Sequence, residues 1–240
     1  MTYLIDTHFH LDYYPNYKEL YDYINESKQY TLCMTNSPGI YKSCCRILGE
    51  TKYIKFAMGL HPKSRDLTIN DFNQFISMSF MTNYFGEIGL DFSNSKKHVS
   101  KEKQLLYFDE IVKIASNHNK LMSIHLRKSE NYAIEILNKY QPQKAVIHWF
   151  NGSKKQLEEL IHLNCYFSVN TNMLTKSKEM VRLIPKDKIL VESDGPFTKL
   201  QNKKFYPQLL QSAYNEIAIK TEIDEFKSIV YENFTTLVNF

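Results

Sequence analysis

The sequence predicts an α/β fold, a (β/α)8 TIM barrel whose functional site lies at the carboxyl ends of its strands. Three observations predict it. Short apolar segments alternate with longer amphipathic segments about eight times along the 240 residues. Most of the apolar segments lack a polar face, as expected for strands buried on both sides of a parallel sheet. Side chains that bind metals end several of these segments, where barrel active sites are built.

Eight apolar segments are the expected strands, because they are short and rich in β-branched or aromatic residues. They are residues 3–6 (YLID), 30–35 (YTLCMT), 53–59 (YIKFAMG), 84–89 (YFGEIG), 121–125 (LMSIH), 144–149 (KAVIHW), 165–169 (CYFSV) and 188–192 (KILVE). An open, doubly wound sheet would show the same alternation, so the strands alone leave two architectures possible.

Helices are expected between the strands. The clearest begins after Ser100, whose hydroxyl can cap a helix. Its apolar face comprises Leu105, Phe108, Ile111, Val112 and Ala115. A second helix begins after Ser153 and presents Leu157, Leu160 and Ile161. A closing helix presents Phe226, Ile229, Val230, Phe234 and Leu237. With no linker-like segment in between, residues 1–240 are expected to form one domain.

Composition narrows the class of protein. The formal net charge of +4 mildly favours an acidic partner such as nucleic acid, although no dense run of basic residues forms a track. The four cysteines form no C-x-x-C pair, which is typical of reduced thiols in the cytosol. We find no signal-peptide pattern at the N-terminus and no apolar run of the roughly 18 residues that span a membrane. A cytoplasmic protein without membrane partners is therefore expected.

The first strand leads into the motif Asp6-Thr7-His8-Phe9-His10. Two histidines two residues apart on an extended segment point to the same side, so both imidazoles can reach one metal ion. Such a pair is weak support alone, because it also occurs at strand ends by chance. Its position at the carboxyl end of a predicted strand strengthens it.

Other predicted strands also end in metal-binding side chains. Glu87 lies in the fourth strand, His125 and His148 end the fifth and sixth, and the eighth leads into Glu192 and Asp194. In a closed barrel these ends converge on one point, whereas in an open sheet they would be spread out. The convergence therefore favours the barrel and predicts one shared site.

Four imidazoles and several carboxylates are more ligands than one tetrahedral ion needs. They suit two ions about 3.5–4 Å apart. Glu87 is the natural bridge, because a carboxylate offers one oxygen to each ion. Imidazole-rich ligation favours zinc, manganese, iron or nickel over a site built for magnesium alone.

Six motifs follow one another along the sequence: D-x-H-x-H (6–10), GLHP (59–62), GEIGLDF (86–92), His125 followed by Arg127, His148 followed by Phe150 and Gly152, and ESDGPF (192–197). Taken in this order, they resemble the motifs of the TatD-family deoxyribonucleases, which belong to the amidohydrolase-like barrels. The resemblance covers about residues 4–197, and Glu232-Asn233-Phe234 is similar to the family's closing helix.

The resemblance implies roles for individual residues. His8, His10, Glu87 and Asp194 would hold one metal ion, and Glu87, His125 and His148 the other. Glu87 and Asp194 would be catalytic, with Asp194 also taking the proton of the attacking water. His61 and Arg127 would grip phosphate.

Further roles come from position. Glu192 lies one layer deeper on the face of Asp194 and could buttress a ligand histidine. Asp91 is either a supporting group or a polar strand end. Trp149 and Phe150 could stack on a base or simply pack.

Three departures from the family pattern concern the rim. Residues 148–152 read HWFNG instead of H-C-F-S-G, Lys63 replaces the second histidine of G-x-H-P-H, and the segment between Phe197 and Pro207 is short. The ligand set is intact, so hydrolysis is expected and the substrate is open.

The expected function is hydrolysis of DNA phosphodiesters, single-stranded or at 3′ ends, with water activated by two divalent ions (zinc, manganese or magnesium). Two alternatives remain. One is a metal-dependent hydrolase of a non-nucleic substrate on the same barrel. The other is a TatD-like component of a bacterial anti-phage defence assembly, with a protein partner that the sequence does not identify.

Overall fold

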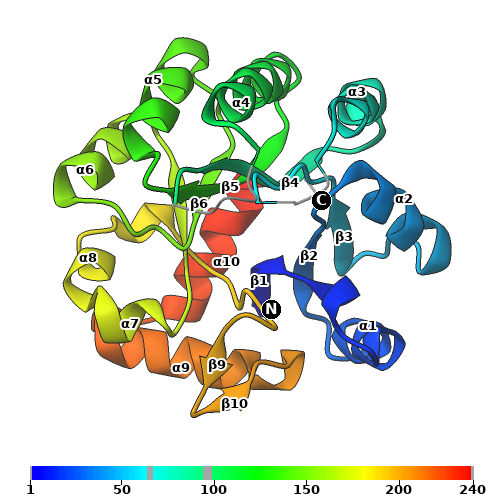
Figure 1. The fold of residues 1–240 in the computed structure, drawn as a ribbon. Coiled ribbons are helices and arrows are strands. Elements are labelled where there is room, and N and C mark those ends of the chain that lie inside the picture. The colour runs from blue at the N-terminus through cyan, green and yellow to red at the C-terminus, as the bar shows by residue number, and fades with distance from the viewer. Residues whose placement is uncertain (1, 64–66, 94–98, 239–240) are drawn as a thin grey trace.

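The computed structural model describes residues 2–63, 67–93 and 99–238 (Figure 1). Eight parallel strands follow one another around a barrel in chain order. They are β1 (Ile5–Phe9), β2 (Tyr30–Met34), β3 (Ile54–Ala57), β4 (Tyr84–Asp91), β5 (Leu121–Arg127), β6 (Ala145–His148), β7 (Tyr166–Val169) and β8 (Ile189–Val191). Parallel pairing is continuous within β1–β3 and within β4–β8.

Backbone contacts close the two seams between these sheets. A parallel bridge between Met58 and Phe85 joins the end of β3 to β4. On the other side, the Asp194 amide donates to the His8 carbonyl and the His10 amide donates to the Gly195 carbonyl, each at 2.9 Å. The segment after β8 is thereby fastened to β1. The ring is closed, which confirms the predicted TIM barrel and excludes the open sheet.

In Figure 1 most of the helices surround the strands, and α10 (Phe226–Leu237) crosses behind the barrel. The other α-helices are α1 (Tyr17–Glu26), α2 (Pro38–Ile47), α3 (Ile69–Met78), α4 (Lys101–Asn117), α5 (Glu130–Tyr140), α6 (Lys154–His162), α7 (Met173–Lys176), α8 (Lys178–Arg182) and α9 (Leu210–Thr221). Short 3-10 helices are η1 (Leu11–Tyr13), η2 (Ser79–Met81), η3 (Lys186–Lys188) and η4 (Pro207–Leu209), and a small hairpin pairs β9 (Lys199–Leu200) with β10 (Lys203–Lys204).

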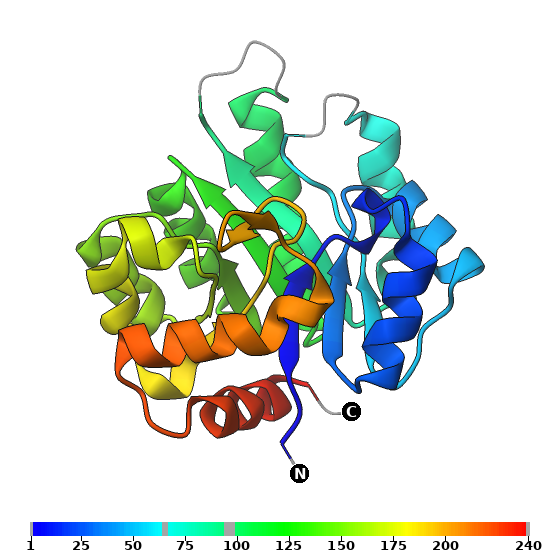
Figure 2. The same cartoon turned by 90° about the horizontal axis from the view of Figure 1, so that it is seen from below.

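Capping and packing explain where the predicted helices begin. The Ser100 hydroxyl accepts from the Lys103 amide, and Ser153 forms a capping box with Gln156 at the start of α6. The closing helix α10 contacts β1 and β8 and crosses the amino-terminal end of the barrel, where Figure 2 shows both ends of the chain. The carboxyl ends of the strands are left open at the opposite end.

Several strands extend further than the sequence predicted. The first was expected at 3–6 but runs from Ile5 to Phe9, so His8 lies within it. The fourth and fifth continue to Asp91 and Arg127. The residues at these strand ends are polar and therefore resemble loop residues in the sequence. They stay in the sheet because their backbones continue to pair with the neighbouring strand.

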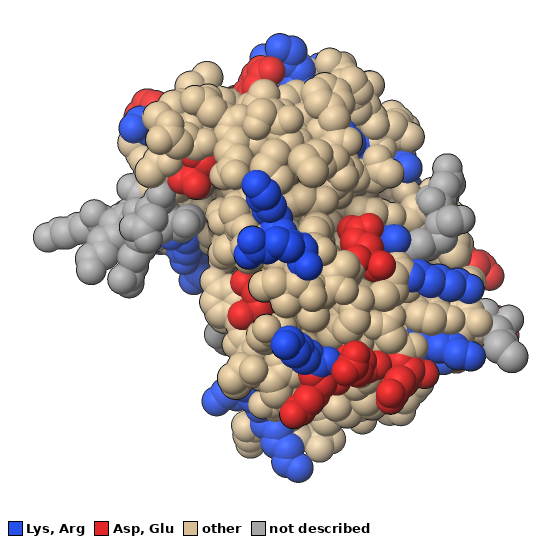
Figure 3. Space-filling view, turned by 90° about the vertical axis from the view of Figure 1, so that its right-hand side faces the viewer, with Lys and Arg blue, Asp and Glu red and all other residues tan. Residues whose placement is uncertain are grey.

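The surface of the described residues carries mixed charge. On the face drawn in Figure 3, the coloured lysine and arginine side chains lie among aspartates and glutamates and form no continuous basic track. Among the helices that the structure describes, none combines the length and apolar character needed to cross a lipid bilayer.

Gly59 allows the backbones of three strands to meet. A Cβ at this position would lie 1.6 Å from the Thr35 carbonyl oxygen and 2.8 Å from the Glu87 amide nitrogen. We expect Gly59→Ala to lower the free energy of unfolding by at least about 1–3 kcal/mol, the usual cost of overpacking. Urea unfolding followed by circular dichroism measures it.

Gly39→Ala is the matched control. Gly39 lies in the first turn of α2, and the nearest atom to an added Cβ is 3.9 Å away. Alanine there should be neutral or stabilise the helix by up to about 1 kcal/mol. Equal stability of the two variants would contradict the close approach at Gly59.

Candidate metal centre

Asp6 fastens the first histidine pair to the end of the barrel. This buried carboxylate accepts from the His8 amide at 3.2 Å and from the Ser193 amide at 2.9 Å. The Thr7 hydroxyl donates to the Val191 carbonyl at 3.0 Å. Burial raises the pKa of Asp6 to about 7. The D-x-H-x-H segment is thus fixed to β8, and both imidazoles face the interior of the mouth.

Glu87 lies at the middle of the mouth. Its amide donates to the Thr35 carbonyl at 3.0 Å, and its carbonyl accepts from the Leu60 amide at 3.0 Å. The ends of β2 and β3 therefore hold the Glu87 backbone on one side while its side chain projects inward. The Glu87 side chain is buried.

One oxygen of Glu87 faces the first histidine pair. Glu87 Oε2 lies 3.6 Å from His8 Nε2 and 3.3 Å from His10 Nε2. Asp194 Oδ1 lies 3.8 and 3.6 Å from the same two nitrogens. His8, His10 and Asp194 therefore form one group of potential ligands.

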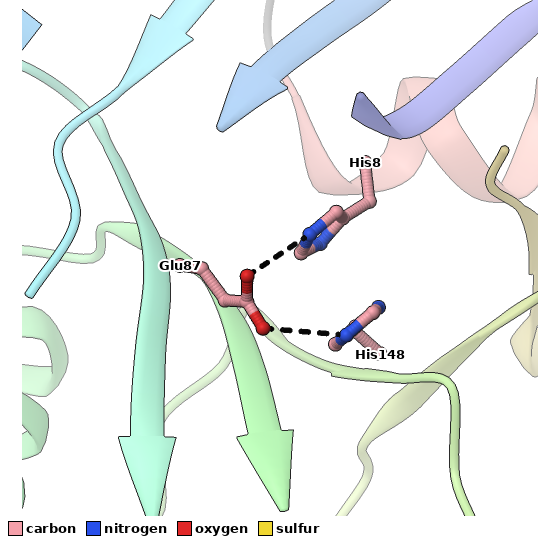
Figure 4. A group of neighbouring side chains, drawn as sticks. All are labelled: His8, Glu87 and His148. Atoms are coloured by element: carbon pink, nitrogen blue, oxygen red, sulfur yellow. Dashed lines mark ion pairs between the residues drawn. The ribbon is translucent and has the colours of Figure 1, made fainter. Parts of the chain in front are cut away.

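The other oxygen faces three different imidazoles. Glu87 Oε1 lies 2.8 Å from His125 Nδ1, 3.4 Å from His148 Nε2 and 3.2 Å from His61 Nε2. Figure 4 shows the carboxylate between His8 and His148, with a different oxygen directed at each. All six predicted ligands are thus gathered in one place, and His61 joins them.

The donor set fits divalent cations. Imidazole nitrogens and carboxylate oxygens within 4.8 Å of one another form three overlapping groups: His8–Glu87–His148, His8–His10–Asp194 and His61–Glu87–His125. Nitrogen and oxygen donors of this kind suit zinc, manganese or similar ions. So many lone pairs converging in a buried space are best stabilised by positive charge between them.

The pKa values show how burial acts on this cluster. Burial lowers the pKa of His8 to about 3 and raises that of Asp194 to about 7. Burial also opposes the charge of Glu87, but His61 and the other imidazoles around it hold the pKa of Glu87 well below its usual range. The His8 imidazole is therefore kept neutral, the form that binds a metal ion.

Glu192 orients His148 from below. Its Oε2 lies 3.0 Å from His148 Nδ1, which leaves Nε2 directed at Glu87. The Ser168 hydroxyl donates to the same carboxylate, and Asn170 Nδ2 donates to Oε1 at 2.8 Å. The buttressing position expected for Glu192 corresponds to a direct contact with one of the predicted ligands.

Two further imidazoles have partners on their outer nitrogen. Ser123 Oγ lies 2.8 Å from His8 Nδ1, and Asp91 Oδ2 lies 2.9 Å from His125 Nε2. Asp91 is thus more than a polar strand end. Sequence reasoning missed Ser123, because a serine inside an apolar strand is also an ordinary core residue.

His61 is held by its own loop. Its Nδ1 accepts from the Lys63 amide at 3.0 Å, so the proton of the neutral ring lies on Nε2, toward Glu87. This geometry makes His61 a donor to Glu87 or to a bound anion. It is compatible with the phosphate contact expected for this residue.

A cavity of about 680 Å³ opens over the cluster. Lys63 and Arg127 contribute positive charge to its lining, and Lys63 Nζ lies 3.2 Å from Asp91 Oδ2. The aromatic residues of the lining are Tyr13, Trp149 and Phe197. Phe150, by contrast, is buried against Phe167, so it packs in the core as the plainer interpretation held.

Left-handed backbone conformations recur around this mouth. Lys128 follows β5 directly with a φ of 55°, Trp149 follows β6 with 41°, and Asp194 follows β8 with 47°. None is glycine, so each conformation costs roughly 1–2 kcal/mol. Two of these residues, Trp149 and Asp194, line the cavity over the cluster.

Sequence comparisons relate this chain to known proteins. A family model described as TatD related DNase matches residues 5–239. "Deoxyribonuclease Tat-D" of Schizosaccharomyces pombe is 33% identical over 133 residues, which cover 53% of this chain and 42% of that protein, less than half its length. The "uncharacterized metal-dependent hydrolase YabD" of Bacillus subtilis is 28% identical over 251 residues, 96% of each chain.

Solved structures share the fold. The crystal structure of YjjV, a TatD homologue from Escherichia coli, superposes with a TM-score of 0.83 at 20% identity, covering 99% of this chain and 98% of that one. An uncharacterized amidohydrolase from Saccharomyces cerevisiae superposes with a TM-score of 0.85 at 14% identity, covering 99% and 100%. At these identities the likeness concerns the barrel alone.

Proposed function

Because the chain belongs to the family of TatD related DNases, whose relatives include metal-dependent hydrolases, we propose that it hydrolyses phosphodiester bonds in DNA. The proposed reaction removes nucleotides from a 3′ end and uses two divalent ions held around Glu87. Residues 1–240 would form one catalytic domain. The 3′ polarity rests on the resemblance of the motifs.

The observation that carries the proposal is the division of the Glu87 carboxylate between two groups of imidazoles. His8, His10 and Asp194 would hold one ion on the Oε2 side, and His125 and His148 the other on the Oε1 side. Ions bound there would supply Lewis acidity toward a phosphoryl oxygen and would make a nearby water more acidic.

The protein's own groups would do the remaining work. Asp194 follows β8, and its backbone amide donates a hydrogen bond to the His8 carbonyl; its carboxylate would accept the proton that the attacking water loses. Glu192 and Asp91 would keep His148 and His125 in orientation. Lys63 and Arg127 line the same cavity and would hold phosphate oxygens.

Metal analysis combined with DNA digestion tests this function. The purified protein is expected to bind up to two divalent ions per chain and to shorten end-labelled single-stranded DNA from its 3′ end when manganese, zinc or magnesium is supplied. A chelator should abolish cleavage. Absence of bound metal, or hydrolysis of a neutral ester with no cleavage of DNA, would contradict the proposal.

Arg127 provides a second, more local prediction. Its exposed side chain lines the cavity two residues after His125. We expect Arg127→Ala to raise the KM for DNA by about tenfold or more, the usual loss for a hydrogen bond to a charged group, while metal content stays normal. Arg127→Lys should recover part of the loss, because lysine keeps the charge but lacks the forked guanidinium.

Salt dependence separates a phosphate contact from a general structural effect. Loss of one contact should reduce the slope of log binding against log salt by about 0.7–0.9. Arg46→Ala on the outer helix α2 is the control and should change neither KM nor slope. Identical salt slopes for the parent and Arg127→Ala would rule out the contact.

A further inference from the structure

Two aromatic side chains stand half-exposed inside the cavity. Tyr13 comes from η1 just after the histidine pair, and Phe197 comes from the segment after β8. They are 43% and 52% exposed, and both line the cavity over the metal centre. Their rings lie 5.1 Å apart at an interplanar angle of 69°. Apolar surface left open inside a polar cavity suits a ligand with a flat apolar face.

Both rings lie beside the first group of predicted ligands. The centroid of the His10 ring is 5.2 Å from that of Phe197 and 5.5 Å from that of Tyr13. His10 in turn reaches Glu87 Oε2 at 3.3 Å. A group bound against these two rings would therefore lie next to a group bound between His10 and Glu87.

Both residues have contacts that hold them. Asn36 Nδ2 donates to the Tyr13 hydroxyl at 2.7 Å. The Phe197 amide donates to the Asp194 carbonyl at 2.8 Å, which ties the Phe197 backbone to a predicted ligand, and its ring packs against those of His10 and Tyr13. Preorganised aromatic faces bind flat partners without loss of side-chain freedom.

Positive charge belongs to the other side of Glu87. Lys63 Nζ contacts Asp91 Oδ2, the oxygen that also contacts His125 Nε2, and Arg127 pairs in register with Asp91. His125 faces Glu87 Oε1 rather than Oε2. The cavity thus has aromatic residues on one side, the predicted metal centre in the middle and cationic residues on the other side. This order matches the base, the scissile phosphate and the neighbouring phosphate of a nucleotide chain.

Resting on the proposed function, we propose that Tyr13 and Phe197 form a nucleobase-stacking subsite for the nucleotide at the cleaved end. The base stacks on the open face of Phe197, with Tyr13 bounding it, while Lys63 and Arg127 hold the next phosphate. Phenyl and phenol rings stack on every base, so the subsite selects for the presence of a base rather than for its identity.

The test compares two single-stranded oligonucleotides that differ only in the residue at the cleaved end, one carrying a base and one abasic. For the parent, kcat/KM should be about 5- to 100-fold higher with the base, the range of base–aromatic stacking. Phe197→Leu keeps the apolar volume but removes the aromatic face, so this ratio should fall toward one. Phe197→Tyr and Tyr13→Phe should preserve it.

Phe80→Leu is the matched control, because Phe80 is 70% exposed on η2, outside the cavity lining. It should leave the ratio unchanged. Bound metal and thermal unfolding are measured for every variant. A ratio near one in the parent, or an unchanged ratio in Phe197→Leu, overturns the subsite while DNA cleavage itself persists. If the metal-loaded parent cleaves no phosphodiester, the proposed function fails and the subsite fails with it.

Discussion

Glu87→Gln is expected to remove most bound divalent metal and to lower hydrolysis by more than about a hundredfold. Loss of a group that only supports a ligand costs about 10- to 100-fold in affinity or activity, and Glu87 faces both groups of imidazoles directly. Glutamine keeps the shape but has one carbonyl oxygen, and its amide hydrogens would point at nitrogens on one side. Elemental analysis and kinetics on the same preparation measure both losses.

Glu135→Gln on the exposed face of α5 is the matched control for this change. It removes the same charge without touching the cavity, so metal content and turnover should equal those of the parent. If Glu87→Gln still binds two ions per chain with parental affinity, the carboxylate does not join two sites.

Asp194→Asn should lower turnover by about 10²- to 10⁴-fold, the range for a lost proton acceptor. The fold should survive, because burial already disfavours the charged form of Asp194, whose pKa is raised to about 7. The metal-free variant should therefore unfold at a temperature equal to or above that of the parent. Steady-state kinetics with saturating metal and calorimetry provide the two measurements.

The control for Asp194 is Asp187→Asn, an exposed residue of η3. It should leave both turnover and unfolding temperature unchanged. Near-parental cleavage of DNA by Asp194→Asn would show that the proton is taken elsewhere and that the role assigned to this carboxylate is wrong.

The barrel could be predicted because strands buried on both faces leave a strong signal. Short, mostly apolar segments such as residues 121–125 and 165–169 predict buried strands. Strand ends were less predictable. His8 and Arg127 are polar and resemble loop residues. Backbone pairing of β1 with β2 and of β5 with β4 decides where these strands stop, and this pairing is not visible in a local segment.

The convergence of the residues proposed as ligands could be predicted for a similar reason. Parallel strands bring their carboxyl ends together, so Glu87, His125 and His148 had to meet once the barrel was assumed. The tightness of the group and the direction of each nitrogen depend on Ser123 and on other buried partners, whose residue types are common in any core.

The rim is the part that sequence reasoning missed. The sequence predicts a phosphate contact for His61, which also contacts Glu87. It shows Lys63 only as a departure from the family pattern, although Lys63 pairs with Asp91. Tyr13 follows β1 and Phe197 follows β8, so the two residues are far apart in the sequence although their rings are neighbours. Residues outside the regular strands and long helices share no periodicity, so only the folded chain shows that these two meet.

The left-handed turns at Lys128, Trp149 and Asp194 affect how this protein would respond to directed evolution. Glycine at any of these positions would relieve roughly 1 kcal/mol of backbone strain, so a screen for heat tolerance alone rewards it. At Trp149 or Asp194, the same substitution removes an indole or a carboxylate from the lining of the cavity. Selection for thermostability without a parallel assay of turnover would therefore enrich well-folded but inactive barrels.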